Sequence, residues 1–156
     1  MIQPSASTVS HAIPKLYLLT NDDEFGLLYQ KLETALATEL IALLQIRRKQ
    51  ILALSDGASV LYKEALQIVD LAKNYNVPVV INDNIALAAK LGVGVHLGQQ
   101  DGDVSEAIQS LAPNQIVGRT CHGDVTLIKA AKDEGASYAA MGAIFASNTK
   151  PNADII

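Results

Sequence analysis

The sequence predicts an α/β fold in which about six parallel strands, each followed by a helix, curl into an incomplete (β/α) barrel. Short apolar runs alternate along the chain with segments whose apolar residues recur every three or four positions, and the links between them are short. Such alternation is typical of a parallel sheet with right-handed crossovers. The apolar runs are continuous, as expected for strands that are buried on both faces.

The composition indicates one soluble domain, predicted over residues 15–156. The chain has 156 residues, and its 49% of hydrophobic residues is enough for a sizeable core. The net charge of -4 and the lack of a basic block argue against a nucleic-acid partner. The single Cys121 fits a reducing cytoplasm, and no apolar stretch in the sequence is long enough to span a membrane. We therefore expect a cytoplasmic protein without a membrane partner.

The first strand–helix unit follows a polar arm. Residues 1–14 are polar and include prolines, so we expect a flexible arm there. The apolar run 16–20 predicts a strand. Apolar residues at every third or fourth position then predict a helix over 25–40, with Asp22 or Asp23 as its N-cap.

The next two units occupy the middle of the chain. The apolar run 41–46 predicts the second strand, and serine, aspartate and glycine mark a loop over 50–58. The apolar face of 59–75 predicts a long helix. A third strand is predicted at 77–81 and a short helix at 85–91.

Three further strands are predicted in the second half of the chain. Apolar runs at 94–97 and 116–119 predict the fourth and fifth strands, and their helices are predicted over 104–111 and 124–134. The sixth strand is predicted at 138–141.

Polar residues at the predicted strand ends favour a barrel over an open doubly wound sheet. An open sheet binds ligands where its strand order reverses, whereas a barrel collects functional groups on one rim from every strand. Nearly every strand end here carries polar groups, namely Gln45/Arg47/Lys49, Asn82/Asp83, Gln99/Asp101, Thr120/His122 and Ser147/Thr149/Lys150. A complete barrel has eight strands and roughly 200 residues or more, so we expect this one to lack the last two units.

Two aspartates follow neighbouring predicted strands. Asp83 comes directly after the third strand and Asp101 shortly after the fourth, with Asn82 beside the first. Together the two carboxylates could hold one Mg²⁺. This ion takes oxygen ligands, retains several water ligands and usually also coordinates phosphate oxygens of the substrate. In the alternative interpretation each aspartate caps the helix that follows it, and the two roles can coexist.

A basic run follows the second strand. Gln45, Arg47 and Lys49 alternate along a segment predicted to be extended, and period-two spacing aims all three to one side. A guanidinium beside an ammonium suits a pyrophosphate. The alternative interpretation is a solvated basic turn.

Hydroxyls, an ammonium and two histidines complete the candidates. Ser147, Thr149 and Lys150 lie on a turn that could cradle an anion or be an ordinary exposed turn. His122 follows a strand and could be a general acid or base, or have a structural role. His96 lies within an apolar strand and is predicted to be a core or rim histidine.

These motifs, in this order, resemble the thiamine phosphate synthase and TenI family over essentially the whole chain after the arm. The segment 45–49, QIRRK, is similar to the family's Q-L-R-x-K, and 81–83, IND, resembles its I-N-D. GVHLGQQD at 94–101 and GAIFASNTKP at 142–151 resemble its G-V-H-L-G-Q-x-D and G-P-x-F-x-T-x-T-K. The fold implied by the resemblance is the TIM (β/α)8 barrel.

The resemblance also implies a reaction and its residues. The family joins a hydroxymethylpyrimidine diphosphate to a thiazole phosphate, releasing pyrophosphate and forming thiamine phosphate. Asp83 and Asp101 would hold Mg²⁺. The implied substrate-binding residues are Gln45, Arg47, Lys49, Asn82, Thr120, Ser147, Thr149 and Lys150. The catalytic candidates are Arg47, Lys49, Lys150 and His122, of which the cations would stabilise the departing pyrophosphate.

The sequence departs from the family pattern in three places. Asn84 stands where the family often has arginine, Ser147 replaces a threonine, and the chain ends before the last two units, which bind the thiazole phosphate in the family. An open barrel would expose the edges of its first and sixth strands, which a partner or a second copy could cover. The alternatives to a synthase are a TenI-like thiazole tautomerase, whose histidine shuttles a proton, and a non-catalytic binding remnant.

Overall fold

The structure, a computed structural model, describes residues 15–145. The expected arm at 1–14 and the candidates Ser147, Thr149 and Lys150 lie outside the described residues. Within the described range, six parallel strands form one sheet in the order β1-β2-β3-β4-β5-β6.

Strands and helices alternate as predicted. The strands are β1 (Leu16–Leu19), β2 (Ile41–Ile46), β3 (Val79–Asn82), β4 (Gly94–Leu97), β5 (Val117–His122) and β6 (Tyr138–Met141). The helices are α1 (Phe25–Leu36), α2 (Lys49–Leu52), α3 (Gly57–Asn74), α4 (Ile85–Leu91), α5 (Val104–Ser110) and α6 (Val125–Asp133).

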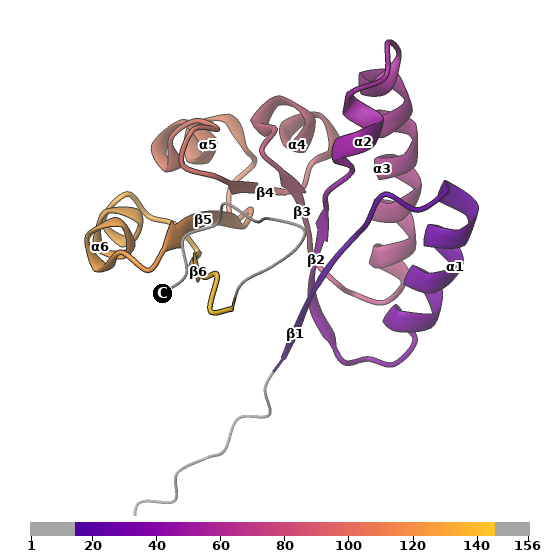
Figure 1. The fold of residues 1–156 in the computed structure, drawn as a ribbon, viewed down its shortest axis with the longest axis horizontal. Helices are drawn as coiled ribbons and strands as arrows, with labels where there is room; N and C mark the ends of the chain where they lie inside the picture. The colour runs from indigo at the N-terminus through magenta and orange to yellow at the C-terminus, as the bar shows by residue number, and fades with distance from the viewer. Residues whose placement is uncertain (1–14, 146–156) are drawn as a thin grey trace, which may run out of the picture.

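The strand order decides between the open doubly wound sheet and the barrel that the sequence allowed. It runs from first to sixth without a reversal, so the sheet is not doubly wound. Figure 1 shows the sheet curling with its helices around the outside. The two edge strands approach each other across the inside, where the Tyr17 and Tyr138 hydroxyls lie 2.6 Å apart. This half-barrel of six strands confirms the predicted incomplete barrel.

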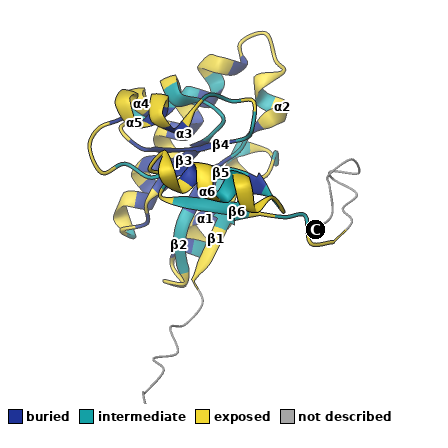
Figure 2. Ribbon diagram, turned by 90° about the vertical axis from the view of Figure 1, so that its left-hand side faces the viewer, coloured by how far each residue is buried: buried dark blue, intermediate teal, exposed yellow. Residues whose placement is uncertain are grey.

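The core lies between the central strands and the helices that cover them. Leu44 and Val95 from the sheet and Leu36 and Ile68 from α1 and α3 are completely buried. Figure 2 shows β3 and β4 mostly buried, while β1 and β6 are more exposed. Leu16 on β1, for example, is 51% exposed. Over residues 15–145, no helix has the combination of length and apolarity that crossing a bilayer requires.

The first helix is shorter than predicted. It ends at Leu36 because Glu39 adopts a φ of 61°, which a right-handed helix cannot continue through, and Leu40 is left exposed. The predicted caps are also wrong, since Glu24 accepts a hydrogen bond from the Leu27 N–H and is the N-cap.

The loop predicted at 50–58 is partly helical. The short helix α2 begins at Lys49, and α3 already begins at Gly57. A Cβ atom on Gly57 would overlap the carbonyl oxygen of Ile51. Glycine therefore allows the two helices to meet at a close turn that the sequence pattern alone presents as a loop.

Candidate active site

A cavity of about 250 Å³ opens at the carboxyl ends of the strands. Every candidate that the sequence predicted within the described part of the chain lines this cavity. These residues are Gln45, Arg47, Lys49, Asn82, Asp83, Asp101, Thr120 and His122. They come from four consecutive strand ends, which the parallel order of the sheet brings to one rim.

The basic side of the cavity comes from β2 and the segment after it. Gln45 lies within β2 and is buried, Arg47 follows the strand, and Lys49 is the first residue of α2. The prediction of an extended segment through Lys49 is therefore wrong, because a helix begins at Lys49. All three side chains nevertheless line the cavity.

Arg48, between the two cavity-lining cations, points into the protein. Its guanidinium is 1% exposed and donates to Glu64 on α3, with Nε 2.9 Å from Oε2 and Nη2 3.2 Å from Oε1. Nη1 also donates to the carbonyl oxygens of Asn21, at 2.9 Å, and Asp23, at 2.6 Å. The interpretation of this run as a solvated turn is wrong for Arg48, which joins the β1–α1 loop, the end of β2 and α3.

Asp83 is held at the end of β3. Its N–H donates to the carbonyl of His96 at 2.8 Å, and its φ of 62° lies in the left-handed region that aspartate and asparagine tolerate. Its Oδ2 accepts from Asn82 Nδ2 at 2.6 Å and lies 3.5 Å from Lys49 Nζ. The carboxylate therefore lies between a carboxamide and an ammonium.

Asp101 lies over the same stretch of backbone as Asp83. A Cβ atom on Gly98 would overlap Asp101 Oδ2 and would lie 3.8 Å from Asp83 Oδ1. Gly98 thus leaves the space into which both carboxylates project.

The electrostatics of this pair favour a cation. Burial raises the pKa of Asp101, and the charge of Asp83 and a hydrogen bond with it raise the pKa further. The Gly98 backbone and the charge of Lys49 oppose these effects in part. The nearby charge of Asp83 disfavours the ionised form of Asp101, and a bound cation would relieve the repulsion.

Neither aspartate caps a helix, so the alternative role predicted for them is wrong. Asn84 caps α4 by accepting from the Leu87 N–H at 2.8 Å. Asp103, not Asp101, is the N-cap residue of α5.

The β5 wall of the cavity extends further than predicted. β5 continues to His122, so Thr120 and His122 lie on the strand and not after it. Arg119 on the same strand donates to the carbonyl of Gly102 at 2.6 Å and to that of Gln99 at 3.4 Å. The Arg119 side chain thereby fastens the loop that carries Asp101.

His96 stands in the wall of the cavity and is only 9% exposed. Its Nε2 lies 2.9 Å from Thr120 Oγ1, and its Nδ1 lies 2.8 Å from the Tyr138 hydroxyl. These contacts confirm the prediction of a rim histidine with partners. Sequence reasoning did not identify Tyr138, Arg119 or the Arg48–Glu64 pair.

The donor set fits a hard divalent ion. Among residues 15–145 there is no group of three or more histidine, cysteine or acidic side chains that could hold a metal. Mg²⁺ does not need one, because it commonly takes one or two carboxylates and completes its shell with water and phosphate oxygens. Asp83 and Asp101 are the residues that could hold it.

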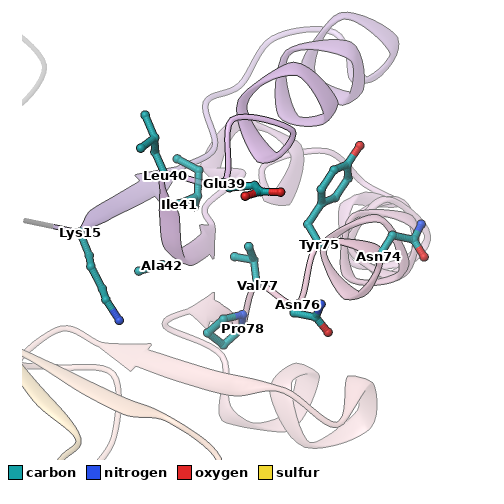
Figure 3. A pocket seen from close by; sticks show the side chains of 10 residues that line it. All are labelled: Lys15, Glu39, Leu40, Ile41, Ala42, Asn74, Tyr75, Asn76, Val77 and Pro78. Atoms are coloured by element: carbon teal, nitrogen blue, oxygen red, sulfur yellow. The ribbon is translucent and has the colours of Figure 1, made fainter. Parts of the chain in front are cut away.

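A larger cavity, of about 640 Å³, lies at the opposite end of the sheet (Figure 3). It is bordered by Lys15 before β1, by the start of β2 and by the link between α3 and β3. The ligands of parallel barrels bind at the carboxyl ends of the strands, and the amino ends serve stability. We therefore place the candidate site in the smaller cavity, where the charged side chains converge.

The chain resembles known proteins in sequence and in fold. A family model described as thiamine monophosphate synthase matches residues 16–156. The thiamine-phosphate synthase of Saccharophagus degradans is 45% identical over 100 residues, which are 64% of this chain and 46% of that protein. The chain thus spans about half the length of this curated relative.

A solved structure shares the fold. The thiamine phosphate pyrophosphorylase from Pyrococcus furiosus superposes with a TM-score of 0.65 at 22% sequence identity, over 84% of this chain and 61% of that one. At this identity the match supports the half-barrel architecture and nothing finer.

Proposed function

Since the chain belongs to the thiamine monophosphate synthase family, we propose that it joins a hydroxymethylpyrimidine diphosphate to a thiazole phosphate, forming thiamine phosphate and releasing pyrophosphate. The observation that carries the proposal is the meeting of an acidic pair, Asp83 and Asp101, with a basic pair, Arg47 and Lys49, in one cavity. A diphosphate is recognised by such a combination, because its oxygens bind both cationic side chains and a divalent ion.

Each wall of the cavity has a part in the proposal. Arg47 and Lys49 bind the diphosphate, while Gln45, Asn82 and Thr120 offer hydrogen bonds to the pyrimidine ring. Ser147, Thr149 and Lys150, for which the resemblance implies phosphate contacts, are proposed to complete the anion site. The partners on this proposal are small molecules in the cytoplasm.

The reaction displaces a good leaving group. The bond between the pyrimidine methylene carbon and the diphosphate oxygen breaks, and its electron pair leaves with pyrophosphate. The thiazole nitrogen donates its lone pair to the same carbon and forms the new C–N bond. Arg47, Lys49 and Lys150 stabilise the negative charge that develops on the leaving group. His122, on the same wall as Thr120, is available for proton transfer.

The residues Asp83 and Asp101 would hold Mg²⁺. When bound, Mg²⁺ supplies further positive charge to the diphosphate oxygens.

The proposal is tested with the chain and both substrates, with and without Mg²⁺. We expect thiamine phosphate and pyrophosphate to form in equal amounts, and only with Mg²⁺, as measured by chromatography and a coupled pyrophosphate assay. Metal-independent isomerisation of a thiazole without pyrophosphate release would favour the tautomerase. Mg²⁺-dependent binding of the pyrimidine diphosphate without turnover would mean that the chain binds this compound but does not catalyse the reaction.

As the pH falls, Mg²⁺ binding should be lost at a higher pH than for a site in which the aspartate has its usual pKa. The pKa of Asp101 is raised above its usual value of about 4, so a proton competes with Mg²⁺ earlier as the pH falls. Calorimetric titration of Mg²⁺ at decreasing pH measures the effect. An affinity that stays constant down to about pH 4 would contradict the assignment of Asp101 as a ligand.

A further inference from the structure

A chain of side-chain hydrogen bonds crosses the inside of the half-barrel and reaches the cavity at both ends. Gln45 Nε2 donates to the Tyr17 hydroxyl at 2.9 Å, and the Tyr17 and Tyr138 hydroxyls lie 2.6 Å apart. The Tyr138 hydroxyl lies 2.8 Å from His96 Nδ1, and His96 Nε2 lies 2.9 Å from Thr120 Oγ1. Gln45, His96 and Thr120 line the cavity, whereas the two tyrosines are not among its lining residues.

Tyr138 stands at the junction of the two branches, and packing fixes its ring. The ring stacks on His96, with centroids 5.6 Å apart, and meets Tyr17 edge to face at the same distance. Gly118 lies beneath it, since a Cβ atom there would overlap the phenol end of Tyr138. Burial raises the pKa of Tyr138, so the phenol keeps its proton.

The protons along the chain can be ordered in one direction. Gln45 donates to Tyr17. The Tyr17 proton can then point to Tyr138, and the Tyr138 proton to His96 Nδ1. Neutral histidine has one N–H, which is then on Nε2 and donates to Thr120. The proton of the Thr120 hydroxyl remains for a group in the cavity.

We propose that Tyr138 is a positioning residue for the cavity: its hydroxyl fixes the tautomer and orientation of His96, and thereby the Thr120 hydroxyl, and it holds Gln45 through Tyr17. The inference rests on the proposed function, in which Gln45 and Thr120 contact the pyrimidine half of the substrate. Arg47, Lys49 and the aspartates contact the diphosphate half and do not belong to the chain of hydrogen bonds.

Two ligands separate the two halves of the site. In calorimetric titrations with Mg²⁺ present, Tyr138→Phe should weaken binding of the pyrimidine diphosphate about 5- to 10-fold, as expected for hydrogen bonds lost at the ring. Binding of inorganic pyrophosphate should remain within about twofold of the wild-type value. Tyr29→Phe is the matched control, because Tyr29 lies on α1 against Phe25 and should change neither affinity.

The tautomer of His96 gives a second readout. Nitrogen chemical shifts of the histidine ring should show the proton on Nε2 in the wild type and a shifted tautomer balance in Tyr138→Phe. Tyr17→Phe breaks the chain before Tyr138, so it should weaken pyrimidine diphosphate binding and leave the His96 signals nearly unchanged. This variant also keeps the test available if Tyr138→Phe does not fold.

The outcomes distinguish the inference from the function on which it rests. If the wild type binds the pyrimidine diphosphate and both tyrosine variants bind it equally well, the role of Tyr138 is overturned and the proposed function stands. Equal weakening of both ligands would likewise overturn it, because the effect would then be a general one on the fold. If the wild type does not bind the pyrimidine diphosphate, both proposals fall.

Discussion

Asp83→Asn and Asp101→Asn are each expected to abolish the Mg²⁺-dependent part of diphosphate binding and the proposed turnover with it. Each removes one of the two anionic oxygen donors that face each other over Gly98. Loss of an indirect partner of a metal ligand typically costs 10- to 100-fold in affinity, so loss of a carboxylate ligand should cost at least about 100-fold. Calorimetry with pyrophosphate, with and without Mg²⁺, measures the loss.

Asparagine is the replacement that leaves the fold intact. At position 83 it tolerates the left-handed backbone, with a φ of 62°, that most residues would strain. At position 101 it removes the carboxylate charge, which burial and the repulsion from Asp83 disfavour, so that both raise the pKa of Asp101. A raised carboxyl pKa in the folded state means that stability is lost as the pH rises through that pKa. Asp101→Asn should therefore melt at a higher temperature than the wild type at neutral pH without Mg²⁺.

Asp103→Asn is the matched control for this pair. Asp103 lies two residues from Asp101 on the same loop, is exposed, and makes no side-chain capping hydrogen bond to α5. It changes the net charge by the same amount and should leave Mg²⁺-dependent binding unaltered. If Asp83→Asn and Asp101→Asn behave like Asp103→Asn, the metal assignment is wrong.

The place of the site could be predicted from the sequence because of one regularity. Parallel strands bring their carboxyl ends to one edge, so polar residues after successive apolar runs, such as Arg47, Asp83 and Asp101, must meet. Neither the spacing along the chain nor the composition is needed for this step. The structure brings these residues into one cavity.

The ends of the strands could not be predicted equally well. The apolar run of β5 stops before Thr120, but the strand continues to His122, which pairs with Met141 of β6. Side chains at the rim of a barrel are polar because they face the cavity, so an apolar-run criterion ends such a strand too early. At Lys49 the error is the opposite one: an extended segment was expected, but a helix begins there.

Two sets of contacts that were not predicted join distant parts of the sequence, and only one of them left a signal in it. Tyr17 and Tyr138 are 121 positions apart, and nothing in either segment indicates the other. For Arg48 a signal was present: Glu64 is an acidic residue within the apolar stripe of α3, beside Leu61 and Ile68. A buried acid on a helix face needs a buried cation, and the basic run after β2 supplies one.

Breaking the buried Arg48–Glu64 pair should have the largest effect on stability. Glu64→Gln leaves the Arg48 guanidinium, 1% exposed, without its carboxylate, and loss of one partner of such a pair typically costs about 3–5 kcal/mol. Arg48→Met should cost a similar amount, because it also removes the donors to the carbonyls of Asn21 and Asp23. Urea denaturation of each variant measures the free energy of unfolding.

The double variant Arg48→Met/Glu64→Gln shows whether the charges themselves are responsible. It should lose less stability than the sum of its single variants, by at least about 1.5 kcal/mol, since no unpaired buried charge remains. Lys31→Met, which breaks the exposed ion pair with Asp23, is the control and should cost far less than either single variant. Additive losses in the double variant would mean that Arg48 stabilises the β1–α1 loop through its carbonyl contacts alone. In either case Arg47 and Lys49 flank the anchored residue, so Glu64→Gln should also weaken pyrophosphate binding while the protein is still folded.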